Sequence, residues 1–560
     1  MFRIVKVKKS LFILLFSCIA LGMNAQLLSQ KKVFTRMDSL RGSLRPERTC
    51  FDVTFYNLSV DFDTINKTIT GRNAIYFNVT AGTDKMQIDL AENLSIDQIV
   101  YHGKPISFTR EFNAIFVALP TLLGVNQNDS LVITYHGRPQ IAKRAPWDGG
   151  FVWKHDIHNN LWIAVACEGL GASAWWPCKD HLSDEPDSLQ ITCIVPEQLQ
   201  AVCNGNLRSE KSIAGGKKAV TWFVSYPINL YNVTFNIGNY IHWNDTLKYS
   251  DGDILQLDYY VLSHNKEKAE KQFQQVKPMM LCYEKFLGKY PFMKDGYALV
   301  ETPYLGMEHQ GAIAYGNKYK TGYDGRDYSR IGLDFDYIII HETGHEWWGN
   351  SVSCADIGDM WIHEGFCTYT EAIYVECMYG HEKAIKYINA KKTSIGNKAP
   401  MQGPYGVNEE GDGDMYNKGM LMLNTLRTII NNDSLWWNTI YNIANKQFKY
   451  KTTNAQEVID FVETSTGLSL KPFFRQYLDY PDLPILNYSL KKKNSKSYVF
   501  EYNWTSNVDR FEMPVILNVG PSLLRFNGTT KKQTQLIKVK KRQNVNLNED
   551  LLYFNALKME

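Results

Sequence analysis

Residues 337–371 read YIIIHETGHEWWGNSVSCADIGDMWIHEGFCTYTE, and the rest of the chain is organised around them. The apolar lead-in at residues 337–340 predicts a buried helix. Residues four apart share a helix face, so the imidazoles of His341 and His345 can bind one metal ion together. Glu342 then lies near the ion, where it can take a proton from a bound water molecule. The stretch therefore predicts a catalytic metal site.

Two protein ligands are too few, because catalytic zinc generally has three and a water molecule. Glu364 is the candidate third ligand, and eighteen residues separate it from His345. That distance accommodates a short loop and a return helix, which we predict over Trp361–Glu376. We therefore expect one Zn²⁺ per chain, held by His341, His345 and Glu364.

Chance occurrence and a structural zinc site are the two simpler interpretations of the motif. HExxH can arise by chance in a chain of this length, but a suitably placed later glutamate makes that much rarer. A structural zinc is usually enclosed by four cysteines or histidines, and no CxxC pair accompanies this motif. Both interpretations are weaker than the interpretation as a catalytic zinc site.

The composition is that of an ordinary globular protein of several domains. The chain has 560 residues, too many for one core, so about three domains are expected. Hydrophobic residues make up 44% and charged residues 21%. The net charge of +3 indicates neither nucleic acid nor an anionic membrane as a partner.

Residues 1–25 have the pattern of a signal peptide. Basic residues precede an apolar run at residues 11–23, which is short for a membrane span, and cleavage is expected after Ala25. We therefore expect export to the periplasm or the outside, and no integral membrane segment after removal of the leader. The apolar run continues past Cys18, which argues against a lipid anchor there.

Loss of Cys18 leaves nine of the ten cysteines, so at least one is unpaired or bonded to another chain. The pairing itself stays open.

The remaining chain predicts a multidomain α+β protein. Short alternating segments indicate an N-terminal β-sheet domain over residues 48–260. Helical spacing then takes over, indicating an α/β catalytic domain over residues 261–482. Alternation returns over residues 483–560, where we expect a small C-terminal β-sandwich.

With these motifs in place, the chain resembles the thermolysin-like zinc aminopeptidase family that includes aminopeptidase N and leukotriene hydrolase. The resemblance runs from about Cys50 to Glu560. Its most specific parts are HETGHEWWG at residues 341–349 and WIHEGF at residues 361–366. GMEH at residues 306–309 is similar to the exopeptidase motif GxMEN, YNKG at 416–419 to the catalytic-tyrosine motif, and WPCKD at 176–180 to an N-domain loop.

The resemblance implies a thermolysin-like catalytic fold and a role for each matching residue. His341, His345 and Glu364 would be the zinc ligands, and Glu342 the general base. Tyr416 would hydrogen-bond the developing oxyanion. The substrate-binding residues would be Glu308, Glu168, Gly306 and Met307. The carboxylates of Glu308 and Glu168 would hold the free α-ammonium of a peptide.

The chain also departs from the family pattern. Leu305 stands where the first glycine of GxMEN is usual, and His309 replaces the usual asparagine. His363 replaces a common asparagine beside the third ligand. The resemblance ends with the third domain, so we expect no helical fourth domain and a more open cleft.

The leading expectation is an exported zinc aminopeptidase acting on peptides with a free N-terminus. A thermolysin-like endopeptidase would share the zinc chemistry but would have no use for Glu308. An inactive peptide-binding relative is the third alternative, although it would have no reason to keep a base, a metal site and an oxyanion donor together. The preferred first residue, the physiological substrates and the oligomeric state are not predicted.

Overall fold

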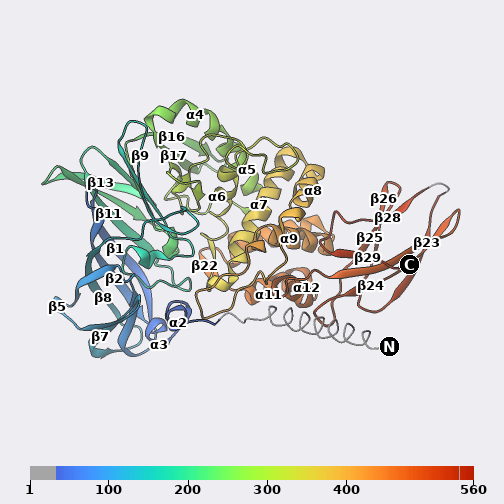
Figure 1. Ribbon diagram of the computed structural model, residues 1–560, viewed down its shortest axis with the longest axis horizontal. Coiled ribbons are helices and arrows are strands. Elements are labelled where there is room, and N and C mark those ends of the chain that lie inside the picture. Colours follow the sequence, from blue (N-terminus) through green and yellow to red (C-terminus); the bar gives the residue numbers. More distant parts are fainter. Residues whose placement is uncertain (1–32, 541–542) are drawn as a thin grey trace, which may run out of the picture.

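The computed structural model describes residues 33–540 and 543–560. Its three parts follow one another along the long axis of the molecule (Figure 1). β-sheets form the N-terminal end, helices fill the centre, and further sheets form the C-terminal end. The multidomain α+β architecture predicted from the sequence is confirmed.

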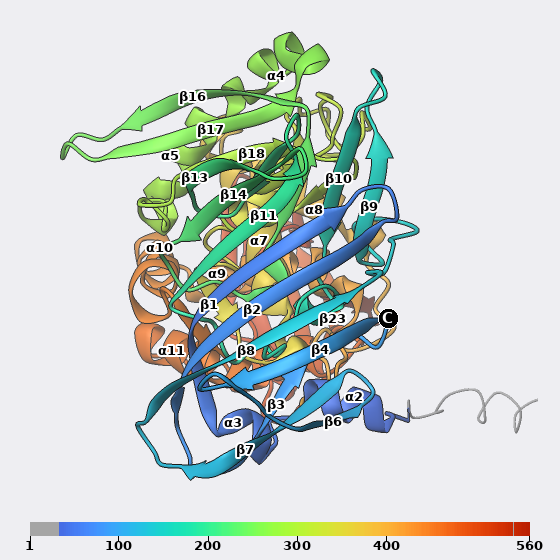
Figure 2. The ribbon, with the colours of Figure 1, turned by 90° about the vertical axis from the view of Figure 1, so that its left-hand side faces the viewer.

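The N-terminal part is built on an eight-stranded sheet with the order β13-β14-β11-β1-β2-β8-β4-β5. Its strands lie across the face seen in Figure 2. Alternate residues of β1 are buried, as its sequence predicts for a sheet with one covered face. The strands are β1 (Phe51–Asp63), β2 (Thr68–Val79), β4 (Leu94–Tyr101), β5 (Lys104–Pro105), β8 (Asn128–Gly137), β11 (Ser188–Pro196), β13 (Asn206–Ile213) and β14 (Lys217–Val224).

Two smaller sheets complete this part, with the orders β12-β15-β10-β9 and β3-β7-β6. Trp175 and Trp176 are fully buried in the shared core. Two short helices, α2 (Arg36–Gly42) and α3 (Pro46–Thr49), precede β1. The strands are β3 (Thr83–Asp89), β6 (Phe108–Glu111), β7 (Ala114–Leu123), β9 (Gly150–His155), β10 (Leu161–Ala166), β12 (Gln200–Cys203) and β15 (Phe235–Gly238).

A five-stranded sheet with the order β16-β17-β18-β20-β19 begins the central part. The short edge strand β19 pairs antiparallel with β20 and ends directly before Glu308. The boundary predicted between residues 260 and 261 falls inside β17, because this sheet already begins with β16. The strands are β16 (Tyr240–Lys248), β17 (Ile254–Leu262), β18 (Tyr297–Glu301), β19 (Gly306–Met307) and β20 (Ile313–Tyr315).

Helices make up most of the rest of the central part, with α7 as its buried axis. A two-stranded parallel sheet of β21 (Val352–Cys354) and β22 (Lys451–Thr453) lies among them. Residues 361–375 of α7 are all buried, so its polar side chains, among them Glu364 and Glu371, face protein rather than solvent. The helices are α4 (Lys266–Gln272), α5 (Val276–Leu287), α6 (Tyr337–Gly344), α7 (Trp361–Tyr379), α8 (His381–Ala390), α9 (Asn417–Ile430), α10 (Asp433–Asn442), α11 (Ala455–Thr466) and α12 (Lys471–Leu478).

The C-terminal part consists of a four-stranded sheet, β27-β24-β23-β29, and a three-stranded sheet, β26-β25-β28. Phe500 of β24 and Leu517 of β25 belong to the same buried cluster as the residues of α7 and α9, so these sheets share a core with the helices. The strands are β23 (Ile485–Asn494), β24 (Ser497–Thr505), β25 (Val515–Val519), β26 (Ser522–Phe526), β27 (Gln533–Lys538), β28 (Val545–Leu547) and β29 (Asn555–Lys558).

The predicted leader, residues 1–25 with Cys18, lies outside the described residues. Among the helices that are described, none has the length and apolarity needed to cross a membrane. The nine cysteines from Cys50 onward are all free thiols, and eight of them are buried.

Candidate metal centre

Helix α6 begins at a tightly held N-cap. The carboxylate of Asp336 accepts a hydrogen bond from the amide of Ile338 at 3.0 Å, which satisfies one of the free donors at the helix start. It also accepts hydrogen bonds from Tyr315 and Asn317, both at 2.7 Å. The last residue of β20 and the loop directly after it therefore fix where helix α6 starts.

Helix α6 lies against α7 because it carries a glycine at the contact. A Cβ atom added to Gly344 would lie 2.9 Å from the Sγ atom of Cys367 on α7. The sequence predicted that His345 lies inside the helix. Helix α6 instead ends at Gly344, and His345 is its C-cap residue. His345 keeps a right-handed helical conformation (φ −64°, ψ −20°). Its side chain therefore still lies on the face of His341.

The three predicted ligands meet at one point. The Nε2 atoms of His341 and His345 are 3.2 Å apart. The Oε2 atom of Glu364, on the first turn of α7, is 3.5 Å from the first of these nitrogens and 3.4 Å from the second. All three residues are buried.

The other nitrogen of each imidazole is occupied. Nδ1 of His341 lies 2.7 Å from the Oε1 atom of Glu371, and Nδ1 of His345 lies 2.9 Å from the carbonyl oxygen of Trp348. A carboxylate or a carbonyl accepts the proton on Nδ1, so each Nε2 presents its lone pair to the centre. Glu371 also accepts a hydrogen bond from Tyr387.

These atoms fit a zinc ion. A zinc ion about 2.1 Å from each tetrahedral ligand holds the ligands about 3.4 Å apart, close to the separations found here. The Oε2 atom of Glu364 is buried and has no hydrogen-bond partner among the described residues. An unpartnered buried carboxylate oxygen facing two imidazole nitrogens is what a metal ion would satisfy.

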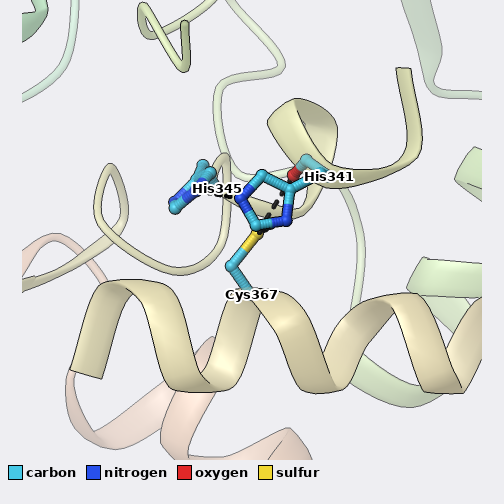
Figure 3. Close-up of side chains that lie close together, drawn as sticks. All are labelled: His341, His345 and Cys367. Atoms are coloured by element: carbon cyan, nitrogen blue, oxygen red, sulfur yellow. Dashed lines mark hydrogen bonds between the residues drawn. The ribbon is translucent and has the colours of Figure 1, made fainter. Parts of the chain in front are cut away.

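Cys367 on α7 also lies beside the two histidines (Figure 3). Its Sγ atom is 3.0 Å from the carbonyl oxygen of His341 and 3.8 Å from Nδ1 of the same residue, the nitrogen that Glu371 occupies. The thiol therefore packs behind His341, and the candidate ligand set consists of the two Nε2 atoms and Glu364.

Glu342, the predicted base, is buried and lines the same cavity as the three ligands. Burial raises the pKa of its carboxyl group to about 7. A carboxyl group with such a pKa can both accept and release a proton near neutrality.

Tyr416 lies immediately before α9 and lines the cavity. Its ring stacks on the ring of His341, with the centroids 6.0 Å apart. Burial and the charge of Glu364 raise the pKa of the phenol well above its ordinary value. Tyr416 therefore keeps its proton near neutrality and can donate a hydrogen bond.

Two further carboxylates lie beside the ligand set. Glu168, Glu308 and Glu364 each offer an oxygen atom within 4.8 Å of the other two. Burial, followed by the charges of Glu308 and Glu364, raises the pKa of Glu168 well above its ordinary value. Burial also raises the pKa of Glu308. The group, in which Glu168 is half-buried and the other two residues are buried, is thus an anionic pocket that a cation would stabilise.

The loop that carries Glu168 is folded around Asp180 of the WPCKD segment. The Asp180 carboxylate accepts hydrogen bonds from the amides of Ala172 and Ser173, at 3.3 and 3.1 Å. Arg41 of α2 donates to the carbonyl oxygen of Gly169 at 3.0 Å. These contacts bring Glu168 from the N-terminal part to the metal centre.

A cavity of about 300 Å³ joins these groups. Gly306 and Met307 line it, as does Leu305, one of the departures from the family pattern. Sequence reasoning missed several wall residues, because they come from distant loops whose local sequence has no motif; they are Pro146, Trp147, Tyr323 and Glu410.

His309 lies apart from this cavity. It is fully buried, neither ring nitrogen has a hydrogen-bond partner within residues 33–540 and 543–560, and burial lowers its pKa to about 3. Its imidazole is therefore neutral.

Glu371 could have been found from the sequence. It follows Glu364 by seven residues, which is two helical turns, so both carboxylates lie on one face of α7. Tyr231, which donates a hydrogen bond to Glu308 at 3.1 Å, gave no such signal, because it reaches the site from the N-terminal part.

Comparison with known proteins agrees with this arrangement. Residues 272–477 match the Peptidase family M1 domain. The leucyl aminopeptidase of Saccharolobus solfataricus is 21% identical over 470 residues, which cover 80% of this chain and 57% of that protein. The puromycin-sensitive aminopeptidase of Caenorhabditis elegans is 25% identical over 345 residues, which cover 58% of this chain and 35% of that protein. The chain thus spans between about a third and three fifths of these relatives.

Solved structures share the fold. The M1 zinc metallopeptidase of Deinococcus radiodurans superposes with a TM-score of 0.64 at 18% identity, covering 79% of this chain and 97% of that one. A two-domain M1 zinc metallopeptidase mutant bound to L-tryptophan gives the same TM-score and identity, covering 80% and 98%. The family resemblance drawn from the sequence is confirmed over residues 272–477, which are similar to the Peptidase family M1 domain.

Proposed function

We propose that this protein is a zinc aminopeptidase that hydrolyses the N-terminal bond of peptides. The observation that carries the proposal is the anionic pocket beside the candidate zinc ligands, in which Glu168 and Glu308 each have an oxygen within 4.8 Å of Glu364. An endopeptidase needs the ligands but not the pocket.

His341, His345 and Glu364 would hold one zinc ion. When bound, such an ion polarises a peptide carbonyl and lowers the pKa of a water molecule to about 7. Glu371 and the carbonyl of Trp348 hold the two imidazoles in the orientation that the ion requires.

Glu342 and Tyr416 would perform the proton transfer and the charge stabilisation. Glu342 accepts a proton from the attacking water and later delivers it to the leaving amine, for which a pKa near 7 is well matched. The phenol of Tyr416 donates a hydrogen bond to the carbonyl oxygen as negative charge develops there, a contribution of about 3 kcal/mol for one such donor.

Glu308 and Glu168 would recognise the free α-ammonium of the substrate. A buried ammonium must be met by carboxylates, and these two carboxylates are destabilised by burial and by each other until a cation arrives. Because they lie at a fixed place beside the metal centre, only the bond after the first residue reaches the reacting groups. An internal peptide segment would leave both carboxylates facing an uncharged amide.

A panel of aminoacyl-arylamides, each with a free and an N-acetylated amine, tests the proposal. Cleavage should be confined to the free amines, abolished by a zinc chelator and greatly reduced in Glu308→Ala. Glu382→Ala, on the exposed side of α8, is the matched control and should behave as the wild type. Chelator-sensitive cleavage of the acetylated substrates would instead indicate an endopeptidase, and inactivity of the zinc-loaded protein on every substrate would refute the proposal.

We further propose that the enzyme acts after export. The basis is the basic and apolar pattern of residues 1–25. Expression of the full chain in a Gram-negative host, followed by mass measurement of the periplasmic protein, should give a mature N-terminus at Gln26. Recovery of the uncleaved chain in the cytoplasm alone would count against export.

A further inference from the structure

Glu308 stands at the end of a chain of buried hydrogen bonds. The amide of Cys354 donates to Nε2 of His363 at 2.7 Å. Nδ1 of His363 lies 3.3 Å from the hydroxyl of Tyr231, and that hydroxyl donates to Oε1 of Glu308 at 3.1 Å. Tyr231, His363 and Glu308 are all buried.

The backbone amide sets the direction of this chain. An amide nitrogen can only donate, so Nε2 of His363 accepts, and the neutral imidazole carries its proton on Nδ1. The Nδ1–H group therefore donates to the hydroxyl oxygen of Tyr231. The single hydroxyl proton of Tyr231 therefore points at Oε1 of Glu308. The other carboxylate oxygen of Glu308 takes no part in this series of hydrogen bonds.

The N-terminal and central parts of the fold meet in this series of hydrogen bonds. Tyr231 lies on a 3₁₀ turn, η2 (Leu230–Asn232), of the N-terminal part, whereas His363 lies on α7 beside Glu364. The turn is anchored to the central part, because Asn229 donates to the carbonyl oxygen of Gly349 at 2.7 Å. The side chain of Asn350 in turn donates to the carbonyl oxygen of Glu308 at 2.9 Å. Both the backbone and the carboxylate of Glu308 are thus held.

Glu308 needs such a restraint because its neighbours repel it. Oxygen atoms of Glu168 and Glu364 lie within 4.8 Å of it, and like charges at that separation favour rotation of the side chain away from the pocket. A hydrogen bond from a buried, directed hydroxyl opposes that rotation without neutralising the carboxylate.

We propose that Tyr231 and His363 are positioning residues that aim the carboxylate of Glu308 at the substrate ammonium. This inference rests on the proposed function. According to this inference, the N-terminal part contributes to amine recognition through Tyr231. The inference also assigns a role to His363, the residue that replaces the usual asparagine beside the third ligand.

The first test is Tyr231→Phe, which removes the hydroxyl and keeps the ring. KM for free-amine arylamides should rise about tenfold or more, the effect of losing one hydrogen bond to a charged group, while kcat changes much less. Tyr135→Phe is the matched control, because Tyr135 is also buried and its hydroxyl has no partner among the described residues. An unchanged KM, or a fall in kcat alone, would overturn the inference.

A double-mutant cycle separates positioning from a general structural role. In a Glu308→Gln background the carboxylate is already absent, so Tyr231→Phe should have little further effect. A purely structural tyrosine would cost the same in both backgrounds, and that result would refute the proposal. His363→Leu should reproduce the effect of Tyr231→Phe, and His363→Gln, which can still accept and donate, should restore part of it. Zinc content, measured by elemental analysis, should be equal in every variant.

Calorimetry provides a readout that does not depend on turnover. The wild type should bind L-phenylalanine amide more tightly than its N-acetyl derivative, and Tyr231→Phe should lose most of that preference. If the wild type cleaves no arylamide, the proposed function fails while this measurement still judges the positioning role. Equal preference in the variant and the wild type, or no preference in either, would contradict it.

Discussion

Gly365 of α7 and Gly419 of α9 are in backbone contact: a Cβ atom added to Gly419 would lie 2.8 Å from the Cα atom of Gly365. One glycine follows the third candidate ligand, Glu364, and the other follows Tyr416 by three residues. The close approach of the two helices therefore sets the distance between the metal centre and the phenol.

Gly419→Ala should push α9 away from α7, because the clash is with backbone atoms that cannot rotate away. We expect a loss of about 1–3 kcal/mol in the free energy of unfolding, measured with urea, and a fall in kcat larger than the change in KM as Tyr416 moves. Gly124→Ala, where an added Cβ meets nothing within 4 Å, is the control. Wild-type stability and kcat in Gly419→Ala would show that the contact is unimportant.

Glu371→Gln should weaken zinc binding. The amide can still accept the proton of Nδ1 on His341, but the negative charge that makes the imidazole a better ligand is lost. The zinc Kd, measured by competition with a chelator, should rise about 10–100-fold. Glu382→Gln on α8 should leave it unchanged. If Glu371→Gln bound zinc as tightly as the wild type, the hydrogen bond to His341 would have no part in metal affinity.

Zinc removal should lower the melting temperature, because the metal binds the folded chain and neutralises Glu364 beside Glu168 and Glu308. At a free zinc concentration of about 100 times Kd the stabilisation is about 2.7 kcal/mol. The rise in melting temperature can be measured by differential scanning fluorimetry, with zinc titrated into protein from which a chelator has removed the metal. The Glu364→Gln variant should respond much less, and an equal response would place the stabilising zinc elsewhere.

Glu342→Gln should remove the proton acceptor and leave the ligands intact. We expect kcat to fall by about 10²–10⁴ while zinc content, measured by elemental analysis, stays at the wild-type value. Retention of kcat would assign the base to another group.

Glu376→Gln should destabilise the protein at neutral pH. Although burial raises the pKa of Glu376, hydrogen bonds from His381 and Arg427 lower it to about 2. A folded-state pKa below the ordinary 4.5 means that the stabilisation is present above pH 4.5 and is lost as the pH falls toward 2. The shift corresponds to at most about 3 kcal/mol.

Urea unfolding at pH 7 and pH 3.5 measures this contribution. The difference between wild type and Glu376→Gln should be smaller at the lower pH, because the carboxyl group is then mostly protonated in the unfolded chain. Its ionisation in the folded pair between Arg427 of α9 and Glu376 of α7 therefore contributes less to stability. A difference independent of pH would mean that packing, rather than the ion pair, is responsible. Glu382→Gln, in an exposed pair, should have little effect at either pH.

Local patterns in the sequence were enough to predict the metal ligands, because these depend on helix periodicity. His341 and His345 share a face at a spacing of four residues, and Glu364 follows on a predicted helix that the structure contains as α7. Alternation likewise predicted the β-sheets at both ends. The boundary predicted near residue 260 lies within β17, a strand whose alternation alone does not show that it pairs with β18 of the central sheet.

The tertiary structure decided how the substrate pocket is assembled. Tyr231, Trp147 and Glu168 come from the N-terminal part and reach the metal centre only because that part packs against the central helices. Such contacts depend on long-range packing, for which no local period exists. The sequence by itself therefore determined the chemistry of the metal centre, whereas the folded chain determined which groups surround it and how Glu308 is held.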